Sequence, residues 1–403
     1  MRLALLAVWL VALLSSAVAR ADDPVVILIS LDGVRHDHPD RGDFPALERM
    51  ARDGARAERM VPVFPSNTFP AHVSLATGTH PDRHGIVDNR FFDRRRGLFD
   101  READASWIDA EPLWIAAERQ GVRTALYFWV GSETDWRGVG ARFRMTPFDS
   151  GVDERDKVVR ILTWLELPAE RRPRLVMSWW NGVDRVGHLK GAEHPDVVDA
   201  LAQQSGHLGA LIAALDARDA WSHTTLLVVS DHGMTPAGEV VPLRERLEAA
   251  GLGGATLVAG TSVAHVFLDS GDETARAEGA LRGLEGVAIY ARDTLPHGLR
   301  FAHPQRTGDL VLLVEPPRTF REPNARQRLG FLGRGFGWTP SLHGYSPGHP
   351  DMGAVFYAMG RGVPAGSRPG RVRMIDVAPT AARLLGIEPP RDAEGSPIPG
   401  LGE

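Results

Sequence analysis

The chain has 403 residues, of which 43% are hydrophobic and 24% charged, a balance typical of a globular protein with a substantial core in one large domain or two modest ones. The formal net charge of -5 gives no sign of a polybasic surface, which disfavours duplex nucleic acid as a partner and leaves small phosphorylated molecules possible. Because the chain has no cysteine, thiolate metal sites and cysteine nucleophiles are excluded, and any metal must be held by His, Asp, Glu or other oxygen ligands.

The N-terminus has the pattern of a signal peptide over residues 1–21. Arg2 precedes an apolar run from Leu3 to about Leu14, and small residues lead to Ala21. The apolar run is shorter than the ~20 residues that a membrane-spanning helix needs, so a permanent anchor is the less favoured alternative. We therefore expect cleavage after Ala21, a mature chain over residues 22–403, export to the periplasm or the exterior, and no stable membrane insertion after cleavage.

Short apolar runs rich in branched residues alternate with amphipathic stretches along the chain. The predicted strands are Val25–Ser30, Thr124–Trp129, Leu175–Trp180, Thr224–Ser230 and Ala354–Met359. The predicted helices are Phe44–Arg52, Leu113–Gln120, Glu154–Leu165 and Val197–Leu215. Continuous apolar strands indicate burial on both faces. Their alternation with helices predicts an α/β fold with a mostly parallel central sheet and helices on both of its faces.

Residues 242–338 have a different pattern. The strand candidates Ala264–Leu268 and Asp309–Val314 are separated by polar connections rich in glycine and proline. This composition predicts a small inserted cap. Within it, the segment Pro317–Arg334 has many arginines and few apolar anchors, which predicts a surface loop.

Acidic and histidine side chains follow three of the predicted strands. Asp32 follows the first strand in ILISLDG, Asp184 and His188 follow another in SWWNGVDRVGH, and Asp231 and His232 follow a third in LVVSDHG. Ligands of an open parallel sheet bind outside the carboxyl ends of its strands. We therefore expect these side chains to converge at one edge of the sheet.

The spacing of these side chains suits metal binding. Asp184 and His188 are four residues apart, so they share one face if a helix begins just before them. With His343 in SLHGYSP, six ligands suit two four-coordinate zinc ions once a nucleophile oxygen and substrate or water are added. Each motif alone also fits a turn, a helix cap or a surface pair, and it is the collection that indicates a metal site.

The segment VPVFPSNTFPAHVSLATGTHP contains the nucleophile candidate, Thr68. Pro70 suits the first turn of a helix with its body at Ala71–Thr77, which places Thr68 at or just before the helix N-terminus. Backbone N–H groups and the helix dipole favour an anion there, both an alkoxide and a bound phosphoryl group. The alternative is that Thr68 serves as an N-cap alone, and the nearby metal ligands favour the nucleophile.

Nine motifs in order carry a resemblance to a known family: ISLDG, FPSNTFPAH, TGTHPDRHGIVDN, EPLW, FWVGSE, VDRVGH, SDHGM, LHGY and IDVAPTAARLLG. Together they resemble the nucleotide pyrophosphatase/phosphodiesterase family of the alkaline phosphatase superfamily, over nearly the whole mature chain. The resemblance implies an alkaline-phosphatase-like core and one metal-dependent phosphodiesterase catalytic domain over residues 22–403. It further implies zinc-dependent hydrolysis of phosphodiester or pyrophosphate bonds, in nucleotide-type substrates, through a phosphothreonine intermediate.

The resemblance also implies roles for individual residues. Thr68 matches the nucleophile, which binds one zinc ion with Asp32, Asp231 and His232, whereas Asp184, His188 and His343 match the ligands of the second zinc ion. Asn89 matches a side chain that donates a hydrogen bond to a non-bridging phosphate oxygen. The chain departs from the family at Trp179, where a tyrosine is common, and both Trp179 and Phe69 are candidates to line an apolar side of the substrate site. Phe69 fits helix-start packing equally well.

Other functions remain as alternatives. A phosphomonoesterase of the same superfamily needs to balance one more negative charge, and no arginine stands beside the Thr68 motif. A phospholipid-type diesterase is compatible with the same motifs. A sulfatase is disfavoured because its modified nucleophile derives from cysteine or serine. A metal-binding protein without catalysis is the least favoured alternative, since all seven nucleophile and ligand positions are filled.

Overall fold

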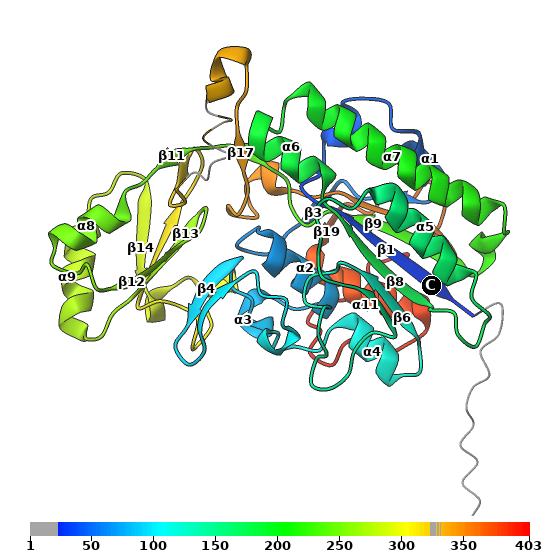
Figure 1. The fold of residues 1–403 in the computed structure, drawn as a ribbon, viewed down its shortest axis with the longest axis horizontal. Helices are drawn as coiled ribbons and strands as arrows, with labels where there is room; N and C mark the ends of the chain where they lie inside the picture. Colours follow the sequence, from blue (N-terminus) through cyan, green and yellow to red (C-terminus); the bar gives the residue numbers. More distant parts are fainter. Residues whose placement is uncertain (1–22, 323–327, 329, 331) are drawn as a thin grey trace, which may run out of the picture.

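The computed structural model describes residues 23–322, 328, 330 and 332–403, and the predicted signal peptide lies outside them. Figure 1 shows a large α/β body and, beside it, a smaller sheet with its own helices. Over the described part of the chain, no helix is both long and apolar enough to cross a membrane.

The α/β body is built on one mostly parallel sheet, as the sequence predicts. The central strand, β1, is paired in parallel with β8 and β9, and every residue of these three strands is buried. This burial explains their continuous apolar sequences. The strand order and bounds are β2 (Ala55–Arg56), β18 (Phe356–Gly360), β9 (Thr224–Val229), β1 (Val25–Leu31), β8 (Leu175–Trp180), β6 (Thr124–Tyr127) and β7 (Phe143–Met145).

Two details of the sheet differ from the sequence-based expectation. Strand β18 runs antiparallel to β9, and β2 runs antiparallel to β18. Strand β6 ends at Tyr127, two residues before its predicted end at Trp129. The reason is that Phe128 has a φ of 63°, a left-handed conformation that a strand cannot contain.

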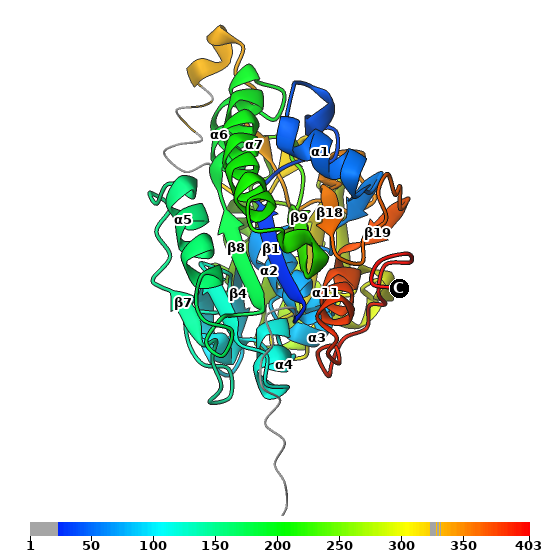
Figure 2. The same ribbon diagram turned by 90° about the vertical axis from the view of Figure 1, so that its right-hand side faces the viewer.

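Helices cover both faces of the sheet (Figures 1 and 2). The predicted helices are confirmed, with ends that agree to within about two residues. One face carries α1 (Pro45–Asp53), α5 (Glu154–Leu165), α6 (Gly182–Lys190) and α7 (Pro195–Asp216). The other face carries α2 (Thr68–Thr77), α4 (Leu113–Arg119) and α11 (Val377–Leu385).

The segment predicted as a cap forms a second, antiparallel sheet with its own apolar core. The sheet has the order β12 (Thr256–Ala259), β13 (Val263–Phe267), β15 (Leu310–Val314) and β14 (Val287–Ala291), and α8 (Leu243–Ala249) and α9 (Gly271–Leu281) pack on it. Strands β13 and β15 agree with the two predicted cap strands to within one residue. The boundaries 242–338 of the cap as a unit remain a prediction.

The surface-loop prediction for Pro317–Arg334 is wrong at its start. Strand β16 (Arg318–Thr319) is paired with β11 (Glu239–Val240), and Phe320 is 4% exposed within the apolar core of the cap. A two-residue strand followed by one aromatic anchor has almost no sequence signal, which explains the error. Residues 323–327, 329 and 331 of this segment lie outside the described residues.

Candidate active site

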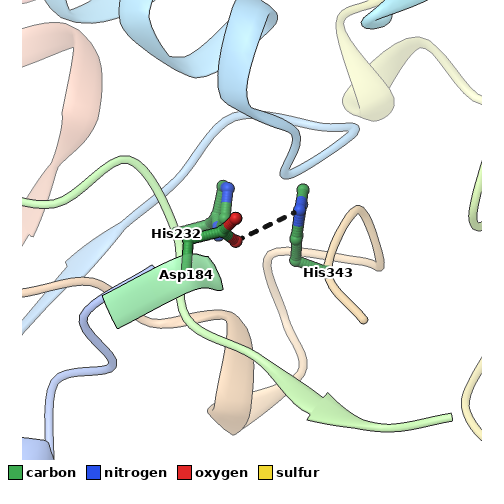
Figure 3. A group of neighbouring side chains, drawn as sticks. All are labelled: Asp184, His232 and His343. Carbon is green, nitrogen blue, oxygen red and sulfur yellow. Dashed lines mark ion pairs between the residues drawn. The ribbon is translucent and has the colours of Figure 1, made fainter. Parts of the chain in front are cut away.

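The predicted ligands converge at the carboxyl edge of the parallel sheet. Asp32 directly follows β1, Asp184 lies in the first turn of α6 after β8, and His232 lies in the loop after β9. His343 comes from the segment after the short strand β17 (Ser341–Leu342), which reaches the same edge. Figure 3 shows Asp184, His232 and His343 pointing toward one another, with 3.7 Å between His343 Nε2 and Asp184 Oδ1.

The first ligand group is Asp32, Asp231 and His232, whose ligand atoms lie within 4.8 Å of one another. Asp231 Oδ1 accepts hydrogen bonds from the backbone N–H groups of Gly33 at 3.1 Å and His232 at 3.0 Å. Asp32 Oδ2 accepts a hydrogen bond from Trp179 Nε1 at 2.8 Å, while Asp32 Oδ1 is buried and has no hydrogen-bond partner among the described residues. Each carboxylate is therefore held by one oxygen and presents the other to the group.

The second group contains Asp184, His188 and His343. His188 Nε2 lies 3.1 Å from His343 Nε2 and 3.4 Å from Asp184 Oδ1. The Asp184 Oδ1 atom is buried, and no residue in the described part of the chain forms a hydrogen bond with it. His232 is within 4.8 Å of Asp184 and His343 as well as of the first group, so it lies between the two groups. The ligand set predicted from the sequence thus occupies one compact volume.

Backbone carbonyls orient all three ligand histidines. The Nδ1 atoms of His188, His232 and His343 lie 2.9 Å, 3.0 Å and 3.2 Å from the carbonyl oxygens of Ser341, Gly233 and Ser66, respectively. A carbonyl oxygen can only accept, so in the neutral imidazoles Nδ1 carries the proton and Nε2 presents its lone pair to the site. Two facing Nε2 lone pairs have no proton to share, whereas a cation satisfies both.

The charges of the site also fit a cation. The pKa of Asp32 is raised well above its ordinary value, first by burial and then by the negative charges of Asp231 and Asp184. Burial raises the pKa of Asp231, but the charge and hydrogen bond of His232, the charge of His72 and the Gly33 N–H together outweigh burial, so the pKa is lowered. The pKa values of His188 and His343 are lowered, chiefly by burial, which keeps these imidazoles neutral. Buried carboxylates beside neutral imidazoles are a donor set that holds divalent metal ions.

Thr68 is the first residue of α2, and its hydroxyl oxygen lies 3.3 Å from His232 Nε2. The N-cap position belongs to Asn67, whose side chain donates to Asp88 instead of capping the helix. The N-cap alternative for Thr68 is therefore wrong. Because Thr68 also begins the helix, its hydroxyl stands at the positive end of the helix dipole, beside the ligand groups.

His72, one helical turn beyond Thr68, supports this arrangement from behind. It is fully buried, with Nδ1 located 2.9 Å from the Thr68 carbonyl oxygen and 3.5 Å from Asp231 Oδ2. Burial lowers its pKa. At this position His72 contacts the predicted ligand Asp231 from outside the two ligand groups.

Asn89 is oriented toward the same space. Its side-chain oxygen accepts a hydrogen bond from the Phe69 backbone N–H at 2.8 Å, which identifies the oxygen and leaves the NH₂ group to donate elsewhere. Asp88 Oδ1 accepts from the Asn89 backbone N–H at 2.6 Å and from Asn67 Nδ2 at 2.7 Å. Burial raises the pKa of Asp88 to about 6. Asn89 and Thr68 line one cavity.

That cavity has a volume of about 270 Å³ and an aromatic side. Phe69 and Trp179 both line it, as predicted, and Trp179 is stacked on Phe148 with ring centroids 4.4 Å apart. The sequence analysis missed Phe148, because it lies in an irregular segment after β7 with no motif around it. Trp179 thus has two contacts in the site: its ring faces the cavity and its N–H holds Asp32.

Three arginines also line the cavity: Arg101, Arg185 and Arg321. No arginine stands beside the Thr68 motif in the sequence, but in the folded protein these arginines line the same cavity as Thr68. Arg101 follows the hairpin of β4 (Arg90–Asp93) and β5 (Gly97–Asp100), Arg185 lies on α6, and Arg321 follows β16. Their convergence depends on the tertiary path of the chain and has no local sequence signal.

The fold is shared with solved structures of the ectonucleotide pyrophosphatase/phosphodiesterase 5 proteins. The murine protein matches with a TM-score of 0.81 and 23% sequence identity, over 91% of this chain and 96% of that one. The human protein matches to the same extent. A further match is an inactive variant of the murine protein in complex with AMP.

Curated relatives share the sequence at higher identity. A pyrophosphatase/phosphodiesterase of Schizosaccharomyces pombe is 37% identical over 221 residues, which cover 53% of this chain and 45% of the relative. Human ectonucleotide pyrophosphatase/phosphodiesterase family member 1 is 27% identical over 387 residues, or 91% of this chain and 40% of the relative. The chain spans less than half the length of these two relatives. A family model described as type I phosphodiesterase / nucleotide pyrophosphatase matches residues 26–344, most of the chain. The chain therefore belongs to the type I phosphodiesterase/nucleotide pyrophosphatase family.

Proposed function

We propose that this protein hydrolyses phosphodiester or pyrophosphate bonds of nucleotide-type substrates, with Thr68 as the nucleophile. One observation carries the proposal: the Thr68 hydroxyl stands at the N-terminus of α2, 3.3 Å from His232 Nε2, next to two groups of metal-binding side chains. Family membership and the names of the relatives, pyrophosphatase/phosphodiesterase, support the same activity.

The donor set supports two zinc ions as the cofactor. Asp32, Asp231, His232 and Thr68 would hold one ion, and the group of Asp184, His188 and His343 would hold the other. His and Asp donors without cysteine suit four-coordinate zinc. When bound, two such ions supply positive charge to the attacking oxygen and the departing oxygen of the displacement.

The residues of the chain divide the reaction into two steps. The Thr68 oxygen forms a bond to phosphorus while the bond from phosphorus to the leaving oxygen breaks, which gives a phosphothreonine. Water then attacks this phosphothreonine and releases the monoester product together with free Thr68. The Asn89 NH₂ group and the Thr68 backbone N–H are placed to donate to non-bridging phosphate oxygens, where negative charge accumulates.

The aromatic side of the cavity favours a diester over a monoester. Phe69, Phe148 and Trp179 suit an apolar substituent such as a nucleobase. Burying a second anionic oxygen against this wall without a partner is costly. The arginines that line the cavity could balance the extra charge of a monoester, which supports the phosphomonoesterase alternative. A phospholipid-type diesterase is a further alternative.

Export is a separate proposal, supported by the pattern of residues 1–21 and by relatives that are named ectonucleotide enzymes.

Removal of the metal ions should abolish activity and lower stability. The purified mature protein should carry about two zinc ions per chain, as measured by elemental analysis. At free zinc about 100 times its Kd, mass action adds about 2.7 kcal/mol to the free energy of unfolding, so the Tm should fall on chelation and recover with zinc. Asp231→Ala should retain about one ion, whereas Asp43→Ala, at an exposed aspartate, should retain both. Full activity after exhaustive chelation would contradict the two-metal proposal.

Thr68→Ala should abolish turnover and leave the zinc content nearly unchanged, because three protein ligands remain for each ion. Asn89→Ala should lower kcat less, by about 10²- to 10³-fold, the usual cost of one lost donor to transition-state charge. Steady-state kinetics with metal analysis on the same samples separates the two effects. Activity of Thr68→Ala close to that of the wild type would exclude Thr68 as the nucleophile.

Phosphodiesters should be hydrolysed in preference to monoesters. The test compares kcat/KM for the nitrophenyl ester of thymidine 5′-monophosphate with kcat/KM for nitrophenyl phosphate, at the same zinc concentration and pH. Phe69→Ala should lower the diester rate and change the monoester rate little. Trp179→Ala is a poorer probe, since it also removes the hydrogen bond to Asp32. Equal or reversed rates in the wild type would point to a phosphomonoesterase.

A further inference from the structure

A second, larger cavity adjoins the one beside Thr68. The second cavity has a volume of about 520 Å³ and shares Asn89, Arg101 and Arg321 with the first. Its other walls come from the β4–β5 hairpin and from the cap, including β12 and the start of α8. A substrate held at Thr68 can therefore extend past Arg321 toward the cap.

The backbone that carries Arg321 is fixed by the cap. The Phe320 backbone N–H donates to the Thr261 carbonyl at 3.0 Å, and the Thr319 hydroxyl donates to the same carbonyl at 2.9 Å. The Arg321 backbone N–H in turn donates to the Thr319 hydroxyl at 3.1 Å. With Thr319 and Phe320 buried, Arg321 is held at the junction of the two cavities.

The Arg321 guanidinium is half-buried and forms no hydrogen bond or ion pair with any residue of the described ranges. Its neighbour Arg101 differs, because Arg101 Nη1 donates to Asp100 Oδ1 at 2.8 Å. The pKa of Arg321 is lowered, first by burial and next by the charge of Arg101, whereas Asp88 and Asp184 oppose the shift. A half-buried cation with five unused donors at a cavity junction is suited to bind an anion.

Positive and negative side chains around the larger cavity are equal in number, but they do not all pair with one another. The larger cavity is lined by four arginines and four acids: Arg90, Arg101, Arg244, Arg321, Asp88, Asp100, Glu245 and Glu322. Arg90 and Arg101 both pair with Asp100, at 3.6 Å and 2.8 Å. Asp88 is engaged by the amides of Asn67 and Asn89. An anion that enters this cavity therefore meets Arg321 as an available donor.

Arg321 lines the same cavity as Asp184 and His188, which belong to the ligand group that the proposed function assigns to the departing oxygen. The aromatic wall of Phe69, Phe148 and Trp179 is available to contact the other substituent, which stays on the phosphoryl group.

We propose that Arg321 is a specificity-determining residue that binds leaving groups bearing their own phosphate, at the junction of the two cavities, and so favours phosphoanhydrides over esters of uncharged alcohols. The inference rests on the proposed function. Its chemistry is a bidentate contact between a guanidinium and the non-bridging oxygens of the departing phosphate, which an aryl or alkyl leaving group cannot make.

The test compares two substrates that share one nucleoside monophosphate. Thymidine triphosphate loses pyrophosphate, whereas the nitrophenyl ester of thymidine 5′-monophosphate loses nitrophenolate. Arg321→Gln should lower kcat/KM for the triphosphate about 10- to 100-fold more than for the aryl ester, the range expected for a lost charged hydrogen bond. Arg321→Lys keeps the positive charge but loses the two parallel N–H donors of the guanidinium. Its kcat/KM for the triphosphate should lie between the values of the wild type and Arg321→Gln. Arg95→Gln, at an exposed arginine of the β4–β5 turn, controls for net charge and should leave the ratio unchanged.

A binding measurement separates a loss of substrate selectivity in Arg321→Gln from a general loss of folded protein. Calorimetry on the zinc-loaded proteins should show that Arg321→Gln weakens binding of α,β-methylene thymidine triphosphate about 10-fold or more, while thymidine monophosphate binds as it does to the wild type. An equal loss for both substrates, or an unchanged affinity for the triphosphate analogue, would overturn the role of Arg321. Wild-type protein that hydrolyses neither substrate would instead overturn the proposed function.

Discussion

Two buried carboxylates, Asp32 and Asp231, with the partly exposed Asp184 beside them at one edge of a parallel sheet, are the constraint on which the rest of the site depends. Asp32 and Asp231 are at most 2% exposed, and the charges of Asp231 and Asp184 both help to raise the pKa of Asp32. Such a cluster is unfavourable unless positive charge is added to it. His188 and His343, whose pKa values are lowered, supply lone pairs but no charge, and His232, whose pKa is raised, supplies at most one positive charge. This imbalance supports our proposal that cations bind at the cluster.

The surrounding fold is arranged to keep that cluster rigid. Backbone carbonyls from three separate segments of the chain hold the predicted ligand histidines, and the N–H of Trp179 fixes one oxygen of Asp32. The Trp179 backbone is itself held from below, because the buried ammonium of Lys157 donates to its carbonyl at 2.8 Å. The aromatic wall and the proposed metal ligands are thus coupled through Trp179, so a substitution at this position is expected to affect both.

Much of this arrangement follows from local sequence. The bounds of β8 and α5 agree with the sequence-based prediction, because apolar runs and amphipathic periodicity are local signals. The i,i+4 spacing of Asp184 and His188 likewise anticipates their shared face on α6. All seven predicted nucleophile and ligand residues lie in one site, although metal binding itself remains a proposal.

What local sequence could not provide is contact between distant segments. Phe148, Arg101 and Arg321 reach the cavity through the path of irregular segments, and no motif surrounds them. The expectation of a surface loop after Pro317 failed for the same reason, since the burial of Phe320 depends on a core formed by other cap elements. The cavity residues without a sequence signal come from these segments, whereas most of the proposed metal ligands directly follow strands.

Trapping the covalent intermediate tests the central claim most directly. Zinc-loaded protein mixed with excess thymidine triphosphate and quenched rapidly in acid should yield, on mass spectrometry, a peptide with thymidine monophosphate attached at Thr68. The Thr68→Ala variant should yield none. Steady turnover with no modified Thr68 peptide at any quench time, or modification at another residue that tracks turnover, would contradict the assignment of Thr68 as the nucleophile.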